Sequence, residues 1–329
     1  MSRGKLREIG LSLCVLLVTL VAAYGALTLG VHLFIDDGMQ FNLEMWKYAR
    51  DINRISADPL IGHEHIPGTS SHLMGVDVTI NTQGLRDREI PLQRTPGTGR
   101  ILMLGDSFTF GWGVPLEDTL PKRLERMFAH DGHPVDVINA GVGNYNTTME
   151  VQYYLSRGYK FEPDVVVLNF IFNDAEPEPT YHDEGYFARN SELAVVFLGA
   201  TDSFLRQSGA ENRWDQYYLG LYEKPGWDAA KAAIHKLAIA ARARGSKLII
   251  VNWPELHDVR HYRLQHVTDL IQAVAESEGV PFIDLLPAVK DQESSRLWVT
   301  PPDPHPNAYA NELYANYLYP KMKAYLAAQ

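Results

Sequence analysis

Residues 101–114 read ILMLGDSFTFGWGV, and this stretch decides the fold class. Its first four residues form a continuous apolar run, which ends at Gly105, Asp106 and Ser107. Continuous apolar runs of this length are typical of strands that are buried on both faces of a sheet. Gly, Asp and Ser are also ordinary turn residues. The stretch therefore predicts a buried strand that ends either in a simple turn or in a site that presents a serine.

Short apolar runs of the same kind recur along the chain, at residues 135–138, 165–168, 248–251 and 281–283. The segments between and after them carry apolar residues at helical spacing. Examples are the sets Ile234, Leu237, Ala238 and Ala241, then Leu264, Val267, Ile271 and Val274, then Tyr309, Leu313 and Tyr317. Strands that alternate with helices build a parallel sheet with helices on both faces. The sequence from Arg100 onward therefore predicts an α/β fold, a three-layer α/β/α sandwich around a parallel five-stranded sheet.

Polar residues follow the predicted strands, and the carboxyl ends of parallel strands meet at one edge of the sheet. In open α/β sheets, functional groups gather at this edge. The segments that reach it are Gly105–Ser107, Asn139–Asn144, Asn169–Asp174, Asn252–Glu255 and, after a further loop, Asp303–Asn307. Together they supply a hydroxyl, a glycine-containing turn, amide side chains and an acid–histidine pair.

This set contains the groups that acyl transfer requires. A serine hydroxyl becomes a nucleophile when a base removes its proton, and His305 is the candidate base for Ser107. An acid must hold the imidazole in the correct tautomer, and Asp303 is the nearest candidate. The negative oxygen of the tetrahedral intermediate needs preorganised donors. The candidate donors are the backbone N–H groups of Ser107 and of the turn at Gly143 and Asn144, and the side-chain amide of Asn173.

Four blocks of the sequence resemble the SGNH, or GDSL-type, hydrolase family. GDSF at residues 105–108 is similar to the first block of that family, with the nucleophile at Ser107. Residues 139–147, 172–174 and 303–307 are similar to its second, third and last blocks, in the same order. The resemblance runs from about residue 100 to the C-terminus. It implies a flavodoxin-like α/β/α fold and esterase, lipase or carbohydrate acyl-ester chemistry through a Ser-His-Asp triad, with no metal or cofactor.

Three positions depart from the pattern of the family. Phe172 stands where the family commonly has Gly, and Asn144 stands where the second block usually has Gly. Asn adopts the left-handed backbone angles of such a turn more readily than most residues. The acid of the family usually lies three residues before the histidine, whereas Asp303 lies two before His305. The changes at 172 and 144 keep open an alternative of another class, a non-catalytic glycan-binding or assembly protein with the same fold.

The N-terminal segment has the composition of a membrane-spanning helix. No charged residue occurs between Glu8 and Asp36, and residues 9–35 exceed the roughly 20 apolar residues that span a bilayer. Three basic residues precede the segment, so the positive-inside rule places residues 1–8 in the cytoplasm and the main domain across the membrane. A cleaved signal peptide is the alternative, but its apolar core is usually only about 7–15 residues long.

The rest of the chain divides into a connector, residues 36–99, and the predicted hydrolase domain, residues 100–329. The connector contains a predicted helical stretch up to about residue 60 and an alternating stretch, 76–80, typical of an edge strand. Residues 175–226 interrupt the strand–helix rhythm and are rich in aromatic residues. Such an insertion beside a catalytic edge predicts a lid or substrate wall, with a separate helical subdomain as the alternative.

Composition excludes several partners and cofactors. The 329-residue chain has a formal net charge of −10, which argues against a nucleic-acid partner. Its single cysteine, Cys14, forms no disulfide or cysteine-based metal site within one chain. The histidines at 63, 65 and 72 and Glu64 lack a further ligand set, so no metal is predicted. Near the site, Asp106 is predicted to cap a helix, Asp174 to be structural, and His257 to be a loop residue or substrate contact.

The sequence as a whole predicts a membrane-anchored serine esterase or O-acyltransferase that acts on acyl esters, with acetyl the expected group, of bacterial cell-surface carbohydrate. Water as acceptor would make it a hydrolase, and a sugar hydroxyl a transferase. A lipid or lysophospholipid esterase is the alternative that the membrane segment favours. The expected location is the inner, or cytoplasmic, membrane with a single pass and a periplasmic or extracellular domain. The expected partners are the acyl-ester substrate and the membrane, and a membrane-protein partner is left open.

Overall fold

The structure of the chain is a computed structural model that describes residues 3–177, 191–208, 214–301 and 303–327. The chain divides into two compact units. Residues 1–46 and 183–210 form the first, and residues 47–182 and 211–329 form the second. The predicted sheet and every residue of the predicted site belong to the second unit.

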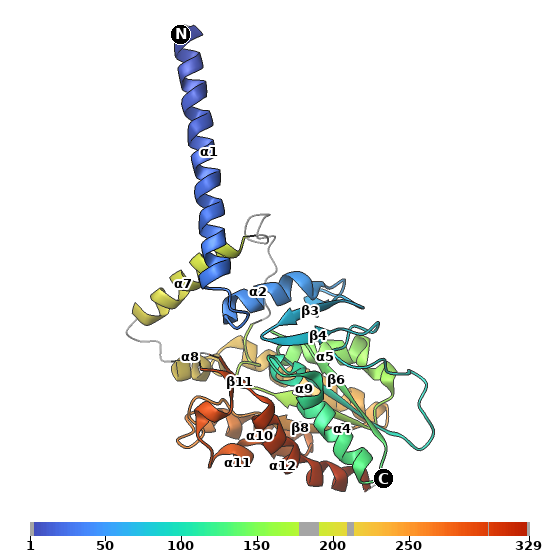
Figure 1. Cartoon of the computed structure of the whole chain (residues 1–329). Coiled ribbons are helices and arrows are strands. Elements are labelled where there is room, and N and C mark those ends of the chain that lie inside the picture. The colour runs from blue at the N-terminus through green and yellow to red at the C-terminus, as the bar shows by residue number, and fades with distance from the viewer. Residues whose placement is uncertain (1–2, 178–190, 209–213, 302, 328–329) are drawn as a thin grey trace. The chain divides into compact units, whose positions relative to one another are not determined.

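The second unit is built on a five-stranded parallel sheet (Figure 1). Its strands are β5 (Gly99–Gly105), β6 (Val135–Gly141), β7 (Val165–Phe170), β8 (Lys247–Asn252) and β9 (Phe282–Asp284). Their order across the sheet is β6-β5-β7-β8-β9, and neighbouring strands are all parallel. The five predicted runs lie in these strands, with only β9 displaced by one residue, so the predicted parallel sheet is confirmed.

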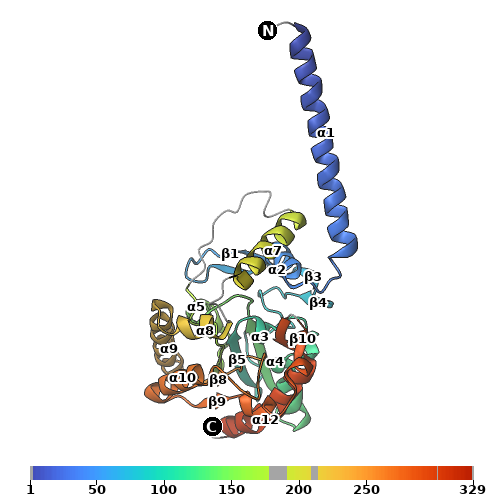
Figure 2. The ribbon, with the colours of Figure 1, turned by 90° about the vertical axis from the view of Figure 1, so that its left-hand side faces the viewer.

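Helices cover both faces of this sheet (Figure 2). On one face α4 packs against α12, and on the other α5 packs against α9. The helices of this unit are α3 (Ser107–Phe110), α4 (Leu120–His130), α5 (Thr147–Ser156), α8 (Trp214–Leu221), α9 (Pro225–Ala243), α10 (Gln265–Glu278), α11 (Leu286–Val289) and α12 (Ala308–Ala327), with 3-10 turns η1 (Leu116–Asp118), η2 (Gly158–Phe161) and η3 (Ser294–Arg296). Every residue of β7 is buried, as a strand between two helical layers requires. The three-layer, flavodoxin-like sandwich is therefore confirmed.

The segment before the sheet is only partly helical. After α2 (Phe41–Asp51) it forms two antiparallel hairpins, β1 (Asn53–Ile55) with β2 (His63–His65), and β3 (Ser70–Leu73) with β4 (Val76–Thr79). The predicted helical stretch thus ends at residue 51, because residues 53–55 find their hydrogen-bond partners in β2 instead. Of the alternating stretch at 76–80, residues 76–79 form the strand β4, as predicted.

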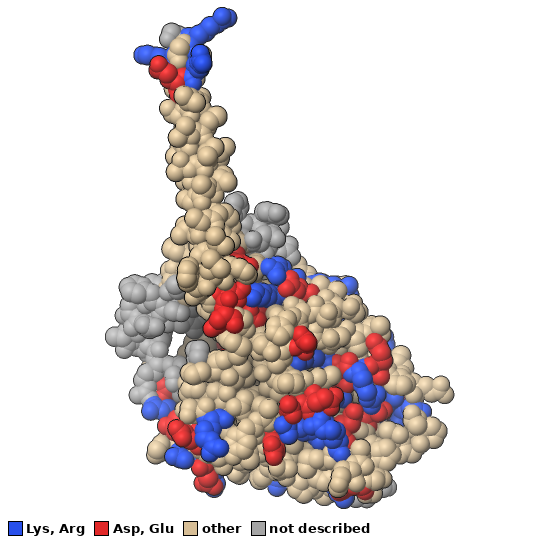
Figure 3. Space-filling view, in the orientation of Figure 1, with Lys and Arg blue, Asp and Glu red and all other residues tan. Residues whose placement is uncertain are grey.

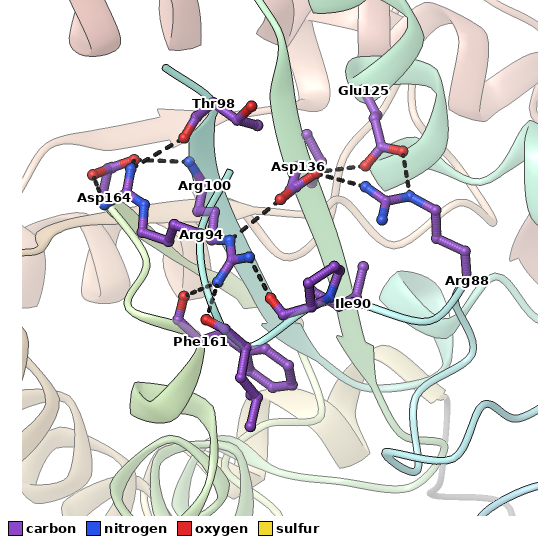
Figure 4. Close-up of polar contacts among 12 residues, drawn as sticks. Arg88, Ile90, Arg94, Thr98, Arg100, Glu125, Asp136, Phe161 and Asp164 are labelled. Atoms are coloured by element: carbon purple, nitrogen blue, oxygen red, sulfur yellow. Dashed lines mark hydrogen bonds and ion pairs between the residues drawn. The ribbon is translucent and has the colours of Figure 1, made fainter. Parts of the chain in front are cut away.

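A network of ion pairs fixes the amino-terminal ends of three neighbouring strands (Figure 4). The Arg100 backbone N–H in β5 donates to Asp164, just before β7, and the Arg100 side chain donates to Asp136 in β6. Arg94 pairs with Asp164 at 2.7 Å, and Arg88 pairs with Asp136 at 2.6 Å. These contacts tie the segment before the sheet to the strand starts, at the edge opposite to the predicted site.

The first unit contains α1 (Arg3–Phe34) and α7 (Glu192–Ser208), which pack against each other. Among the described residues, α1 alone is long and apolar enough to cross a membrane. Its charged side chains gather at its N-terminal end (Figure 3). Of the predicted lid, residues 178–190 and 209–213 lie outside the described residues, so its placement over the site stays a prediction.

Candidate active site

Ser107 is the first residue of α3, and only Asp106 separates it from the carboxyl end of β5. Asp106 caps this helix, since its Oδ1 accepts a 2.8 Å hydrogen bond from Phe108 N–H, and the predicted capping role is confirmed. The helix lies very close to the end of β6. A Cβ on Gly141 would lie 2.2 Å from the Phe110 nitrogen, so only glycine allows this approach. The glycine thus helps to hold the serine above the ends of two strands.

A hydrogen-bonded chain links Ser107, His305 and Asp303. Ser107 Oγ lies 2.8 Å from His305 Nε2, and His305 Nδ1 makes a short hydrogen bond to Asp303 Oδ1. Since an ionised carboxylate only accepts, the Nδ1 atom carries a proton, and Nε2 is left to accept from the serine hydroxyl. The structure therefore brings the predicted nucleophile, base and acid together.

The two-residue spacing of Asp303 and His305 has a local geometric basis. Both residues lie in β11 (Asp303–Pro306), which pairs with β10 (Trp298–Thr300). Asp303 Oδ1 also accepts the backbone N–H of His305 at 3.1 Å, so one oxygen fixes both the backbone and the ring of the histidine. Asp303 Oδ2 accepts the indole N–H of Trp112 at 3.1 Å. The carboxylate is thus held by donors on both oxygens.

The two acids beside the serine have different electrostatic surroundings. Burial acts to raise the pKa of Asp303, but the charge of His305 and the hydrogen bonds from His305 and Trp112 hold that pKa below its ordinary value. Burial raises the pKa of Asp106 to about 6, although hydrogen bonds from Phe108, Asn173 and Ser107 and the charge of His305 oppose the rise. At neutral pH, Asp303 is the firmly ionised partner of the histidine.

The predicted oxyanion donors lie on three neighbouring segments. The turn after β6 is tied to the serine loop, because Val142 N–H donates to the Gly105 carbonyl at 3.0 Å. Asn173 follows β7, and its side chain hydrogen-bonds with the Asp106 carboxyl. The Gly143 N–H donates to the Tyr48 hydroxyl at 2.9 Å. Within the described part of the chain, the Asn144 N–H has no such acceptor, which leaves it as the available donor of that turn.

The sequence profile of the GDSL-like Lipase/Acylhydrolase family matches residues 103–313, well over half of the chain. The chain belongs to this family. It is therefore an ester hydrolase with the SGNH-type fold. No curated protein sequence matches the chain.

Solved structures similar to this acylhydrolase include TesA, with 16% identity, a TM-score of 0.47, and 68% of this chain and 98% of TesA covered. A lipase/acylhydrolase from Enterococcus faecalis has 17% identity and a TM-score of 0.45, with 69% of this chain and 96% of that chain covered. A mutant of Axe2, an acetyl-xylooligosaccharide esterase from Geobacillus Stearmophilus, has 13% identity and a TM-score of 0.43, with 67% and 92% covered.

Aromatic side chains lie beside His305 at the carboxyl edge of the sheet. The Phe108 ring lies 5.0 Å, centroid to centroid, from the His305 ring and 6.2 Å from the Phe172 ring. Phe172 in turn packs edge to face on Tyr218 of α8, at 4.5 Å. Ser107 is only 8% exposed. One aromatic residue of the predicted insertion, Tyr218, thus contacts Phe172, the residue before Asn173.

Sequence reasoning missed several residues that support these loops. Arg86 is buried, and its guanidinium donates to the carbonyls of Phe110, Gly111 and Val114, at 3.0, 2.5 and 2.6 Å. Trp112 holds Asp303, as described above. Arg86 precedes the residues that the family profile matches, and an isolated arginine in a sequence carries no signal of what it will contact.

Two further buried acids, Glu150 and Asp174, lie near Asp106. Both carboxyl oxygens of Glu150, and one of Asp174, lack a hydrogen-bond partner among the described residues. Burial raises the pKa of both groups well above the ordinary value. The other Asp174 oxygen accepts the Ile171 N–H at 2.9 Å, which suits the predicted structural role of Asp174.

The remaining histidines of interest do not converge on one point. In β2, His63 and His65 contact Gly143 and Tyr48, whereas Glu64 pairs with Arg54 and Arg157. His72 is exposed and pairs with Asp77 at 2.8 Å, and His257 pairs with Glu255. Over the described ranges, no group of three or more His, Cys, Asp or Glu side chains is placed to hold a metal.

Proposed function

We propose that this acylhydrolase is a membrane-anchored serine esterase or O-acyltransferase that acts on acyl esters, chiefly acetyl esters, of cell-surface carbohydrate. The single observation that carries the proposal is the hydrogen-bonded chain from Ser107 through His305 to Asp303, at 2.8 Å between Ser107 Oγ and His305 Nε2. This is the spacing at which a base can take the proton of a nucleophile.

In the proposed mechanism, Ser107 Oγ attacks the ester carbonyl carbon while His305 Nε2 takes the hydroxyl proton. Asp303 stabilises the resulting imidazolium from Nδ1. The tetrahedral intermediate then collapses, the C–O bond to the alcohol breaks, and the alcohol leaves with the proton from His305. Water or a sugar hydroxyl next attacks the acyl-enzyme, with His305 again as the base, and Ser107 is restored.

The proposed oxyanion hole consists of the Ser107 N–H, the Asn173 side-chain amide and one N–H of the turn after β6. We assign the turn donor to Asn144 rather than Gly143, because Tyr48 already accepts the Gly143 N–H. Removal of one such donor typically raises the activation barrier by about 3 kcal/mol.

Two features support a small acyl group on a carbohydrate. The Phe108 ring, one residue from Ser107, packs against both the His305 ring and the Phe172 ring, so bulky side chains restrict the space next to the nucleophile. Tyr217 and Tyr218 of α8 lie 5.2 Å apart, and Tyr217 is 42% exposed. Exposed aromatic rings beside a site offer flat faces on which sugar rings can stack.

The apolar helix α1 supports the proposed membrane anchor. Lys and Arg side chains gather at its N-terminal end, which by the positive-inside rule stays in the cytoplasm (Figure 3). The proposed location is the inner membrane, with the hydrolase unit periplasmic or extracellular. The same helix favours a second candidate function, hydrolysis of lipid or lysophospholipid esters, because it would tether the hydrolase unit to a membrane.

The test uses the full-length protein in detergent, with p-nitrophenyl acetate, butyrate and octanoate and with Ser107→Ala as the control. We expect Ser107-dependent release that is fastest for acetate and that an oligosaccharide acceptor accelerates. Release that rises with chain length would favour lipid esters instead. If turnover equals that of the mutant and a fluorophosphonate probe leaves Ser107 unlabelled, the chain is a non-catalytic member of the family and the proposal is wrong.

A further inference from the structure

Asn144, whose N–H follows the Gly143 carbonyl, has an unusual backbone conformation. Asn144 has φ 63°, in the left-handed region that non-glycine residues rarely adopt. Such a conformation persists when the surroundings over-determine it. In a planar trans peptide, the carbonyl of one residue and the N–H of the next point in opposite directions. Whatever fixes the Gly143 carbonyl therefore also fixes the direction of the Asn144 N–H.

His63 holds that carbonyl. Its Nε2 lies 2.7 Å from the Gly143 oxygen, and because a carbonyl only accepts, Nε2 carries the proton. The His63 ring is buried and packs edge to face on Tyr145, with the centroids 5.1 Å apart. The Tyr145 hydroxyl donates back to the His63 carbonyl at 2.6 Å. The position of His63 is thus fixed by contacts to both its ring and its backbone carbonyl.

Tyr48 holds the other side of the same residue. Its hydroxyl oxygen accepts the Gly143 N–H at 2.9 Å, and its hydroxyl proton goes to His65 Nε2 at 2.7 Å. His65 Nδ1 donates to the Gly84 carbonyl at 3.1 Å, which leaves Nε2 as an acceptor. This sets the donor and acceptor of each hydrogen bond from Gly143 through Tyr48 to His65. Burial lowers the pKa of His65 to about 3, so the ring stays neutral.

Gly143 itself is required for this arrangement. A Cβ at this position would lie 2.9 Å from the Tyr48 ring, closer than real Cβ atoms come to other atoms. Tyr48 and the turn therefore fit against each other only when residue 143 has no side chain.

We propose that His63 and Tyr48 are positioning residues that clamp both peptide groups of Gly143 and so aim the Asn144 N–H at the oxyanion. This inference rests on the proposed function and deepens it. It also gives the segment before the sheet a role in the reaction, because both residues precede β5. Neither residue touches the reacting atoms, so each acts only through the turn.

The experiment compares His63→Leu, which removes the donor, with His63→Gln, whose amide N–H can donate in its place. The matched control is His72→Leu, a change at an exposed histidine of β3. The full-length protein in detergent is assayed for kcat and KM with p-nitrophenyl acetate and for the rate of Ser107 labelling by a fluorophosphonate. Crystal structures of both His63 variants report the orientation of the Gly143–Asn144 peptide.

For His63→Leu we expect kcat and the labelling rate to fall about 10- to 100-fold, less than the loss of a whole donor, with KM changed less than about twofold. His63→Gln should recover kcat to within about threefold, His72→Leu should match the parent, and the peptide should be rotated only in His63→Leu. An unmoved peptide in His63→Leu, or equal losses in the Leu and Gln variants, would overturn the inference. Absence of Ser107-dependent turnover in the parent counts against the proposed function alone, because the peptide orientation is read without activity.

Discussion

Replacing Asp303 by Asn removes one charge and converts one accepting oxygen into a donor. In the structure, Asp303 Oδ1 accepts two N–H groups of His305, and Oδ2 accepts the Trp112 indole N–H. All the neighbours are donors, so an Asn side chain must point an N–H at one of them. If it faces His305, it favours the tautomer with the proton on Nε2, which cannot accept the proton of Ser107. If it faces Trp112, a buried indole N–H loses its acceptor.

The magnitude follows from these contacts. Hydrogen bonds to a charged group contribute roughly 1.5–3 kcal/mol each, so the two bonds to His305 sum to about 3–6 kcal/mol. This corresponds to a loss of about 10²- to 10⁴-fold in kcat/KM for Asp303→Asn, since each tenfold in rate is about 1.36 kcal/mol. The assay is release of p-nitrophenol from the acetate ester at pH 7.5, with the unfolding midpoint measured in parallel.

The matched control is Asp77→Asn, which breaks an exposed Asp–His pair, His72 with Asp77 at 2.8 Å. Surface pairs of this kind contribute little, so we expect parent activity from this variant. Asp303→Asn with activity within threefold of the parent and an unchanged unfolding midpoint would refute the argument, because another acid, or none, would then orient His305.

Two further predictions concern stability. Burial raises the Asp106 pKa from 3.8 to about 6, so above pH 6 the folded state carries a buried charge that costs about 3 kcal/mol, and this cost disappears as the pH falls toward 4. Asp106→Asn keeps the capping oxygen but turns the other oxygen, which accepts from Ser107, into a donor. The stability of this variant relative to the parent should therefore rise by up to about 3 kcal/mol between pH 4 and pH 8 in denaturant unfolding, on top of a constant difference. A difference that does not change with pH would contradict the assigned pKa. Arg86→Met should lower the free energy of unfolding by at least about 3 kcal/mol, because the carbonyls of Phe110, Gly111 and Val114 lose buried donors worth roughly 1–3 kcal/mol each. A loss below 1 kcal/mol would show that water replaces the guanidinium.

Much of the fold could be predicted because the signal is local. Each strand of the central sheet is a continuous apolar run, and each main helix carries its own apolar stripe, so both periods are visible in the sequence. The edge of the sheet at which the site lies followed from the parallel topology. The capping role of Asp106 was also predictable, since a cap contacts residues two or three positions away.

The supporting contacts of the site could not be predicted in this way. Trp112 and Asp303 are 191 residues apart, and His63 and Gly143 are 80 apart. No periodicity relates such pairs. The helical prediction for residues 53–55 was wrong for the same reason, because that segment is shaped by its pairing with β2.

The sequence by itself determined which groups reach the carboxyl edge of the sheet, because strand order and residue spacing along the chain place Ser107, Asn173 and His305 there. Only the tertiary structure decided how those groups are oriented. It showed that the Gly143 N–H is engaged by Tyr48 and that Asp303 holds His305 through one oxygen. The physical reason is that hydrogen bonds are directional and act over about 3 Å. The pattern of apolar and polar residues in the sequence predicts which strand a residue follows. Only the packing of the folded chain fixes the direction in which its N–H points.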